Sequence, residues 1–242
     1  MEKFLNLFLI FFIYSVIGYY VELIFCSLNS KKLVLNRGFL IGPYLPIYGF
    51  GGVLISLTLG RYADDILTLF ILSTVYCTVI EYITSYILEK IFHLRWWDYS
   101  NKKYNINGRV CLSNGVLFGL GGLLIIKVFY PFFYRTIYIS NSLFLMILSS
   151  VFLCIFLTDL IVSIRILFGL KSNIIKITNK DATSEIKKEV FDYLINHRIF
   201  TGRLFKSFPD LEDLNEVGIK DIKNIFDNVK KEIENLKKSK SK

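Results

Sequence analysis

Five long apolar runs separated by short charged loops constrain this chain more than any other feature. The runs cover about residues 4–27, 44–60, 66–92, 112–130 and 142–170. Each run approaches or exceeds the ~20 residues that a helix needs to cross the hydrocarbon layer. Inside a bilayer the backbone has to satisfy its own polar groups, which an α-helix does. The pattern therefore predicts an all-α integral membrane bundle of about five spans.

Composition and charge exclude several other classes of protein. The chain is 53% hydrophobic and 16% aromatic, which is more apolar surface than one soluble core of this length needs. The net charge is +9, but 16 of the 29 basic residues follow position 170, where 12 acidic residues leave a net charge of only +4. A Lys-rich segment beside a membrane faces anionic lipid rather than nucleic acid. The four cysteines form no CxxC pair, so we expect neither a metal site nor a disulfide framework. No cofactor is predicted.

The loops between the predicted spans differ in their basic residues. One side carries Lys31, Lys32, Arg37, Arg95, Lys102, Lys103 and Arg109, whereas the other carries Lys3, Arg61 and Arg135. Because cytoplasmic loops are richer in lysine and arginine, we expect the N-terminus outside and the C-terminus in the cytoplasm. The predicted location is the cell membrane.

The chain changes character after Gly169. Lysine becomes frequent, and apolar residues recur at helical spacing in residues 183–196 and 219–237, which is typical of amphipathic helices. We therefore predict two domains. Residues 1–170 form the transmembrane domain, and residues 171–242 form a Lys-rich helical tail in the cytoplasm.

Charged residues inside the predicted spans are the strongest functional signal. Each costs about 2.5–3.5 kcal/mol at the membrane centre and so needs a partner or a wet cavity. Helical spacing places Glu81 and Glu89 on one polar face of the third span. The candidate polar vestibule opens to the cytoplasm, with Glu22, Glu81, Glu89 and Asp159 in the inner half of the membrane. There they are expected to meet residues of the cytoplasmic loops: Asn36, Arg37, Arg95, Asp98 and Arg109. These groups either coordinate a substrate or ion, or only hold the helices together.

Four segments of the chain resemble one bacterial family. They read Gly18-Tyr19-x-x-Glu22, NRGFLIGPYLPIYGFGG (36–52), EYITSYILEKIFHLRWWDYS (81–100) and NINGRVCLSNGVLFGLGG (105–122). Over about residues 4–170 the chain resembles the family called putative ABC-transporter type IV, whose members are labelled ABC transporter permeases. The resemblance implies the membrane-spanning component of an ABC-type transport system, with ATP hydrolysis supplied by a separate subunit.

Three functions stay open at this point. The first is the transport component, for which no clear EAA-like docking loop is found in the sequence. The second is a membrane regulator or scaffold whose tail binds a cytoplasmic partner. The third is a membrane-embedded enzyme that modifies lipid, with Glu22, Glu81, His93 and Asp98 as acid-base groups. We expect a non-enzyme in a lipid bilayer, with a separate ATPase subunit and further copies of the chain as candidate partners, and no nucleic acid.

Overall fold

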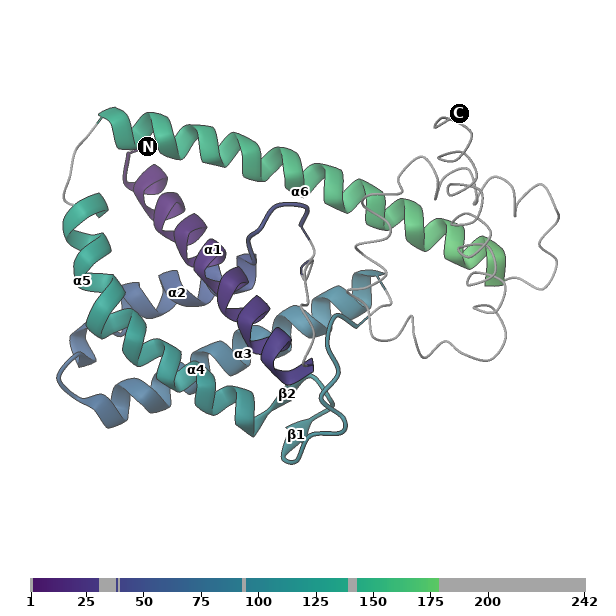
Figure 1. The fold of residues 1–242 in the computed structure, drawn as a ribbon, viewed down its shortest axis with the longest axis horizontal. Helices are drawn as coiled ribbons and strands as arrows, with labels where there is room; N and C mark the ends of the chain where they lie inside the picture. Colours follow the sequence, from purple (N-terminus) through teal and green to yellow (C-terminus); the bar gives the residue numbers. More distant parts are fainter. Residues whose placement is uncertain (1, 31–37, 39, 93–94, 139–142, 179–242) are drawn as a thin grey trace, which may run out of the picture. The chain divides into compact units, whose positions relative to one another are not determined.

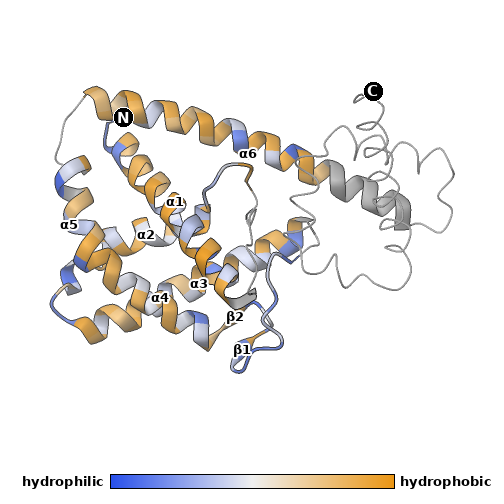
Figure 2. Cartoon of the chain, in the orientation of Figure 1, coloured by the Kyte–Doolittle hydropathy of each residue, from blue (hydrophilic) through white to orange (hydrophobic). Residues whose placement is uncertain are grey.

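Long apolar helices make up most of the part of the chain that the structure describes. The computed structural model describes residues 2–30, 38, 40–92, 95–138 and 143–178. Four helical stretches are long and apolar enough to cross a membrane: α1 (Glu2–Ser30), α3 (Ile66–Phe92), the stretch Leu112–Ile137 that begins with α4 (Leu112–Leu124), and α6 (Leu143–Thr178) (Figure 1). Figure 2 shows apolar residues along these helices and hydrophilic ones in the loops. The predicted all-α membrane fold is confirmed.

The chain divides into two compact units, Met1–Ser163 and Ile164–Lys242. All the contacts described below lie within the first unit. The amphipathic helices predicted at 183–196 and 219–237 lie outside the described residues, and the boundary at residue 170 stays a prediction.

The second apolar segment differs from the expected span. Its helix α2 (Pro46–Thr58) has 13 residues, which give about 20 Å of the ~30 Å hydrocarbon layer. Pro46 begins the helix because proline needs no backbone donor there. Just before it, the Leu45 N–H donates to the Ser15 carbonyl at 2.9 Å, close to the middle of α1. Helix α2 therefore begins beside the middle of α1 and follows an irregular segment, residues 40–45.

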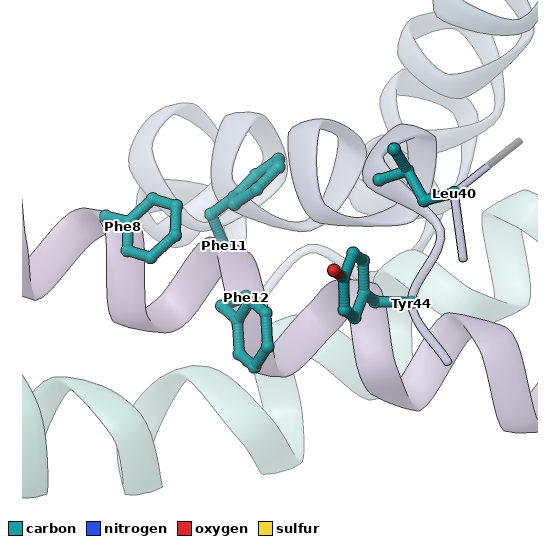
Figure 3. Packing of buried hydrophobic residues seen from close by; sticks show 5 residues of the cluster. All are labelled: Phe8, Phe11, Phe12, Leu40 and Tyr44. Atoms are coloured by element: carbon teal, nitrogen blue, oxygen red, sulfur yellow. The ribbon is translucent and has the colours of Figure 1, made fainter. Parts of the chain in front are cut away.

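Close contacts hold α2 and the irregular segment against α1. A methyl group added at Gly49 would lie 2.6 Å from the Phe11 carbonyl oxygen, so only glycine permits this approach. The Tyr14 and Ser56 hydroxyls are 3.0 Å apart and form a hydrogen bond. Figure 3 shows Tyr44 and Leu40 beside the phenylalanines of α1, where the Phe12 and Tyr44 ring centroids are 5.2 Å apart. Aromatic packing thus replaces regular helix contacts along the irregular segment, residues 40–45.

Helix α3 begins at a capped terminus after a short turn, η1 (Gly60–Tyr62). Asp65 accepts the Thr68 N–H at 3.0 Å, which satisfies one of the unpaired donors at the helix start. The last helix before α6 extends beyond the predicted end at residue 130. It passes through a π-helical turn η2 (Ile125–Phe129), α5 (Tyr130–Phe133) and a second π-turn η3 (Tyr134–Tyr138). Pro131 lacks a backbone N–H, which accounts for the irregular turns around it.

A small hairpin lies between α3 and α4. Strands β1 (Asn105–Ile106) and β2 (Val110–Cys111) are antiparallel, with Asn105 opposite Cys111 and Ile106 opposite Val110. The turn needs positive φ at Asn107 (54°) and Gly108 (67°), which asparagine and glycine tolerate better than other residues. The hairpin sets the position of Arg109, which belongs to the site described below.

Two glycines on α4 provide a matched test of helix packing. A methyl group at Gly119 would lie 2.5 Å from the Phe70 ring on α3, whereas one at Gly121 would meet no heavy atom within 4 Å. We expect Gly119→Ala to destabilise the bundle by about 1–3 kcal/mol. Gly121→Ala should be neutral or stabilising by up to about 1 kcal/mol, because alanine favours helix. Thermal unfolding in detergent measures both, and equal effects would contradict the packing.

Candidate functional site

The described contacts place the predicted polar residues in three groups. Glu22 and Glu81 lie in one, Glu89, Arg95, Asp98 and Arg109 in the second, and Asp159 in the third. Asn36 and Arg37 lie outside the described residues. The polar face predicted on α3 lies toward α4 and the loop before it, since Thr74 and Thr78 lie at 3.4 Å from a methyl group placed on Gly115.

Glu81 is the most buried charged side chain of the first group, with 5% of its surface exposed. The Tyr99 hydroxyl donates to Glu81 Oε1 at 3.2 Å, and Asn114 Nδ2 donates to the Tyr99 hydroxyl at 2.6 Å. Glu81 Oε2 is buried and has no hydrogen-bond partner within the described part of the chain. A buried polar atom normally has a partner. Asn114 also interacts with the Glu81 carboxyl group, but no donor among the described residues forms a hydrogen bond to Oε2.

Glu22 joins Glu81 from α1. The Tyr48 hydroxyl donates to Glu22 Oε2 at 2.8 Å, and the Cys26 thiol donates to Oε1 at 3.2 Å. Glu22 and Glu81 interact electrostatically with each other, and Tyr48 and Tyr99 each interact with both carboxyl groups. The two carboxylates and two phenols thus form one group, which we call the Glu22–Glu81 cluster.

Tyr99 is the part of this cluster that lies in a loop outside the spans. Burial, followed by the nearby Glu81 carboxylate, raises the pKa of the Tyr99 phenol. The phenol therefore stays protonated and acts as a hydrogen-bond donor to Glu81. Asn114, near the start of α4, fixes the position of the phenol. Three elements, α3, the loop and α4, converge at Glu81.

The second group joins the hairpin to the end of α3. Arg109 Nη1 lies 2.5 Å from Glu89 Oε2, and Arg95 Nε lies 3.0 Å from the same oxygen. The Arg109 guanidinium also faces the Tyr82 and Tyr86 rings, with Cζ 5.8 and 5.4 Å from the centroids. Its side chain is only 11% exposed. Glu89 is thus compensated by two arginines, unlike Glu81.

Asp98 has a local role in the same loop. It accepts hydrogen bonds from the Ser100 N–H at 2.9 Å and the Ser100 hydroxyl at 2.6 Å, and Arg95 Nη1 lies at 3.8 Å. The Ser100 hydroxyl is the main cause that lowers the pKa of Asp98. Asp98 therefore stays ionised near neutral pH and does not release or take up a proton readily. His93, its predicted partner, lies outside the described residues.

Asp159 binds the irregular segment before α2. Oδ1 accepts the Ile41 N–H at 2.9 Å, and Oδ2 accepts the Gly42 N–H at 2.7 Å. The Tyr44 hydroxyl and the Ser163 hydroxyl also donate to this carboxylate. Backbone N–H groups that are not part of a helix need hydrogen-bond partners within the protein when they lie inside a membrane. Asp159 supplies them, so its contacts are those of a structural residue.

Sequence reasoning missed the two tyrosines of the Glu22–Glu81 cluster and the asparagine that bonds to one of them. These residues lie near the ends of apolar runs: Tyr48, Tyr99 and Asn114. Tyrosines at such positions normally indicate anchors at the membrane interface. The signal that could have found Asn114 is its place at the start of a span, on the side where Glu81 is expected. Sequence reasoning paired Arg109 with the inner carboxylates in general, and the structure assigns it to Glu89.

A comparison with protein families identifies the family of this chain. The model of the family described as Putative ABC-transporter type IV matches residues 9–164, which include every described residue of the three groups. The chain belongs to this family. Neither the search of curated proteins nor that of solved structures found a match.

Membership in the Putative ABC-transporter type IV family indicates a membrane protein related to ABC transporters. A lipid bilayer is its environment, since the four span candidates agree with the family description. The family favours transport rather than catalysis. Within the described ranges no three His, Cys, Asp or Glu residues are grouped so as to hold a metal ion.

Proposed function

We propose that this chain is the membrane-spanning, permease component of an ABC-type transport system, in which a separate subunit hydrolyses ATP. The Glu22–Glu81 cluster lies on the translocation path in this proposal. Residues 1–170 are the transmembrane domain and residues 171–242 the cytoplasmic tail. The basic residues of the first and third loops support an external N-terminus and a cytoplasmic C-terminus, in a bacterial cell membrane.

The observation that carries the proposal is the incomplete bonding of Glu81. Asp159 and Glu89 have several donors or cations each. Glu81 is more buried than Glu89, yet one of its carboxylate oxygens has no partner among the described residues. A structural carboxylate in a membrane should be fully bonded, since an unpaired buried oxygen costs about 1–3 kcal/mol. A site that receives a cargo group has a reason to leave an acceptor free.

The loop between α3 and α4 is the proposed coupling surface for the ATPase subunit. The Trp97 indole donates to the Arg109 carbonyl at 2.8 Å, and the Tyr99 N–H donates to the Gly108 carbonyl at 2.8 Å. Asn107 in the hairpin turn donates to the Tyr82 hydroxyl on α3 at 2.9 Å. The first two bonds join the loop to the hairpin, and the third joins the hairpin to α3. A displacement of the hairpin would therefore be transmitted to the helix that carries Glu81.

The deciding experiment combines copurification with Glu81→Gln. Purification of the full chain should recover a stoichiometric nucleotide-binding subunit. Glu81→Gln keeps the side-chain shape, so the complex should assemble with unchanged yield. Its ATP turnover in lipid nanodiscs should fall by about tenfold or more, as expected if an interaction worth about 1.4 kcal/mol is lost from the working state.

Asp65→Asn is the matched control for that variant. It also replaces a carboxylate with an amide, but Asp65 lies at the start of α3, far along the helix from Glu81, and asparagine caps helices well. Its turnover and yield should equal those of the unmodified complex. Absence of a nucleotide-binding subunit would exclude the proposal. Normal turnover of Glu81→Gln would remove the cluster from the path.

A further inference from the structure

An open groove lies where the third loop meets α4. Its volume is about 590 Å³, and its lining residues are Lys102, Lys103, Tyr104, Leu112, Ser113 and Val116. No residue of the Glu22–Glu81 cluster lines this groove. One end of the groove is basic and the other is the first turn of a membrane-crossing helix.

The basic end is available for an anionic ligand. Lys102 and Lys103 are exposed, and neither forms an ion pair with any residue that the structure describes. Beside them, no side chain caps the N-terminus of α4. The Leu112 N–H donates to the Tyr104 carbonyl, and the helix dipole gives this end a positive partial charge. Both features favour a negatively charged group at this end of the groove.

The other end continues into an apolar strip along α4. Leu112, Val116 and Leu120 are 55%, 42% and 52% exposed, and their four-residue spacing puts them on one face of the helix. The strip begins beside the two lysines, because Leu112 and Val116 line the groove with them. A ligand here would meet positive charge at its head and an apolar surface along its tail.

We infer that this groove binds an anionic phospholipid. Lys102 and Lys103 contact the headgroup phosphate, and an acyl chain lies along Leu112, Val116 and Leu120. The exposed Tyr104 ring, 79% accessible, lies at headgroup level, as tyrosines at membrane interfaces do. Each lysine near a membrane surface contributes about 1 kcal/mol to binding anionic lipid. A free phosphate would use the lysines but would leave the apolar strip unoccupied.

Native mass spectrometry of the delipidated full chain tests this inference. The probes are phosphatidylglycerol, which is anionic, and phosphatidylcholine, which is zwitterionic, with matched acyl chains. We expect phosphatidylglycerol to bind roughly tenfold more tightly or better. The double variant Lys102→Gln/Lys103→Gln should lose this preference and bind both lipids alike. Because both lysines are exposed, the variant should keep the thermal stability of the unmodified chain.

Lys127→Gln is the matched control, because Lys127 is exposed on the continuation of the same helical stretch, in η2, and should not affect the preference. The inference is overturned if the double variant keeps its preference for phosphatidylglycerol. It is also overturned if inorganic phosphate displaces the lipid as effectively as phosphatidylglycerol itself does, because the site would then bind free phosphate. Neither result would bear on the proposed transport function, which rests on Glu81.

Discussion

Asp159→Ala should prevent recovery of folded protein in detergent. The substitution removes the acceptor for the Ile41 and Gly42 N–H groups and for the Tyr44 and Ser163 hydroxyls. Two backbone donors would lose this acceptor inside the bundle, at about 1–3 kcal/mol each, and the hydroxyls would add to this. We expect a loss of roughly 3–6 kcal/mol, which is a large part of the stability of a typical domain.

Thr158→Ala separates this effect from a general sensitivity of α6. Thr158 is the preceding residue, and among the described residues its hydroxyl bonds to the Cys154 carbonyl of its own helix alone, so its loss should cost less than about 0.5 kcal/mol. Detergent-stable yield and the midpoint of thermal unfolding measure both variants. Near-normal behaviour of Asp159→Ala would mean that the segment before α2 does not depend on this carboxylate.

Arg109→Gln should be the second most damaging change. It removes the 2.5 Å contact with Glu89 and the packing on Tyr82 and Tyr86. Breaking a fully buried ion pair costs roughly 3–5 kcal/mol. Because Glu89 is 31% exposed and keeps Arg95 as a partner, solvent lowers the cost, and we expect about 2–3 kcal/mol. Thermal unfolding, followed through the fluorescence of the neighbouring Trp97, measures the loss.

A double-mutant cycle makes this test specific to the Arg109–Glu89 pair. If the two side chains stabilise each other, Glu89→Gln/Arg109→Gln should cost less than the sum of the single variants, by about 0.5–3 kcal/mol. Arg61→Gln is the control, since Arg61 is exposed and only faces the Tyr62 ring. Strict additivity of the two substitutions would show that Arg109 acts through something other than Glu89.

The sequence predicts the spans better than it predicts the polar contacts between them. Hydropathy locates α1, α3 and α6 because an apolar run of sufficient length has one stable form in a bilayer. Hydropathy overestimates the length of the second helix, because residues 44 and 45 are equally apolar whether they are helical or extended. The irregular segment depends on Asp159, more than a hundred residues away, and no local pattern contains that contact.

In the candidate site, too, the sequence predicts what depends on local geometry but not which polar groups meet. Helical spacing identifies the polar face of α3, including Glu81 and Glu89, since it depends only on local geometry. Which of these carboxylates meets an arginine depends on the fold of the loop that follows. The hairpin turn at Asn107 and Gly108 directs Arg109 to Glu89 and leaves Tyr99 for Glu81. Residue type alone cannot distinguish these two outcomes.

The bond between Asp159 and the segment before α2 also sets an order of events during synthesis. Ile41 and Asp159 are 118 residues apart, and a ribosome adds about 5–20 residues per second. For roughly ten seconds, the Ile41 and Gly42 N–H groups have left the ribosome while their acceptor does not yet exist. During this interval the segment before α2 lacks the carboxylate that accepts these two N–H groups in the folded protein. The bonds that fix this segment can therefore form only after α6, which carries Asp159, has been translated.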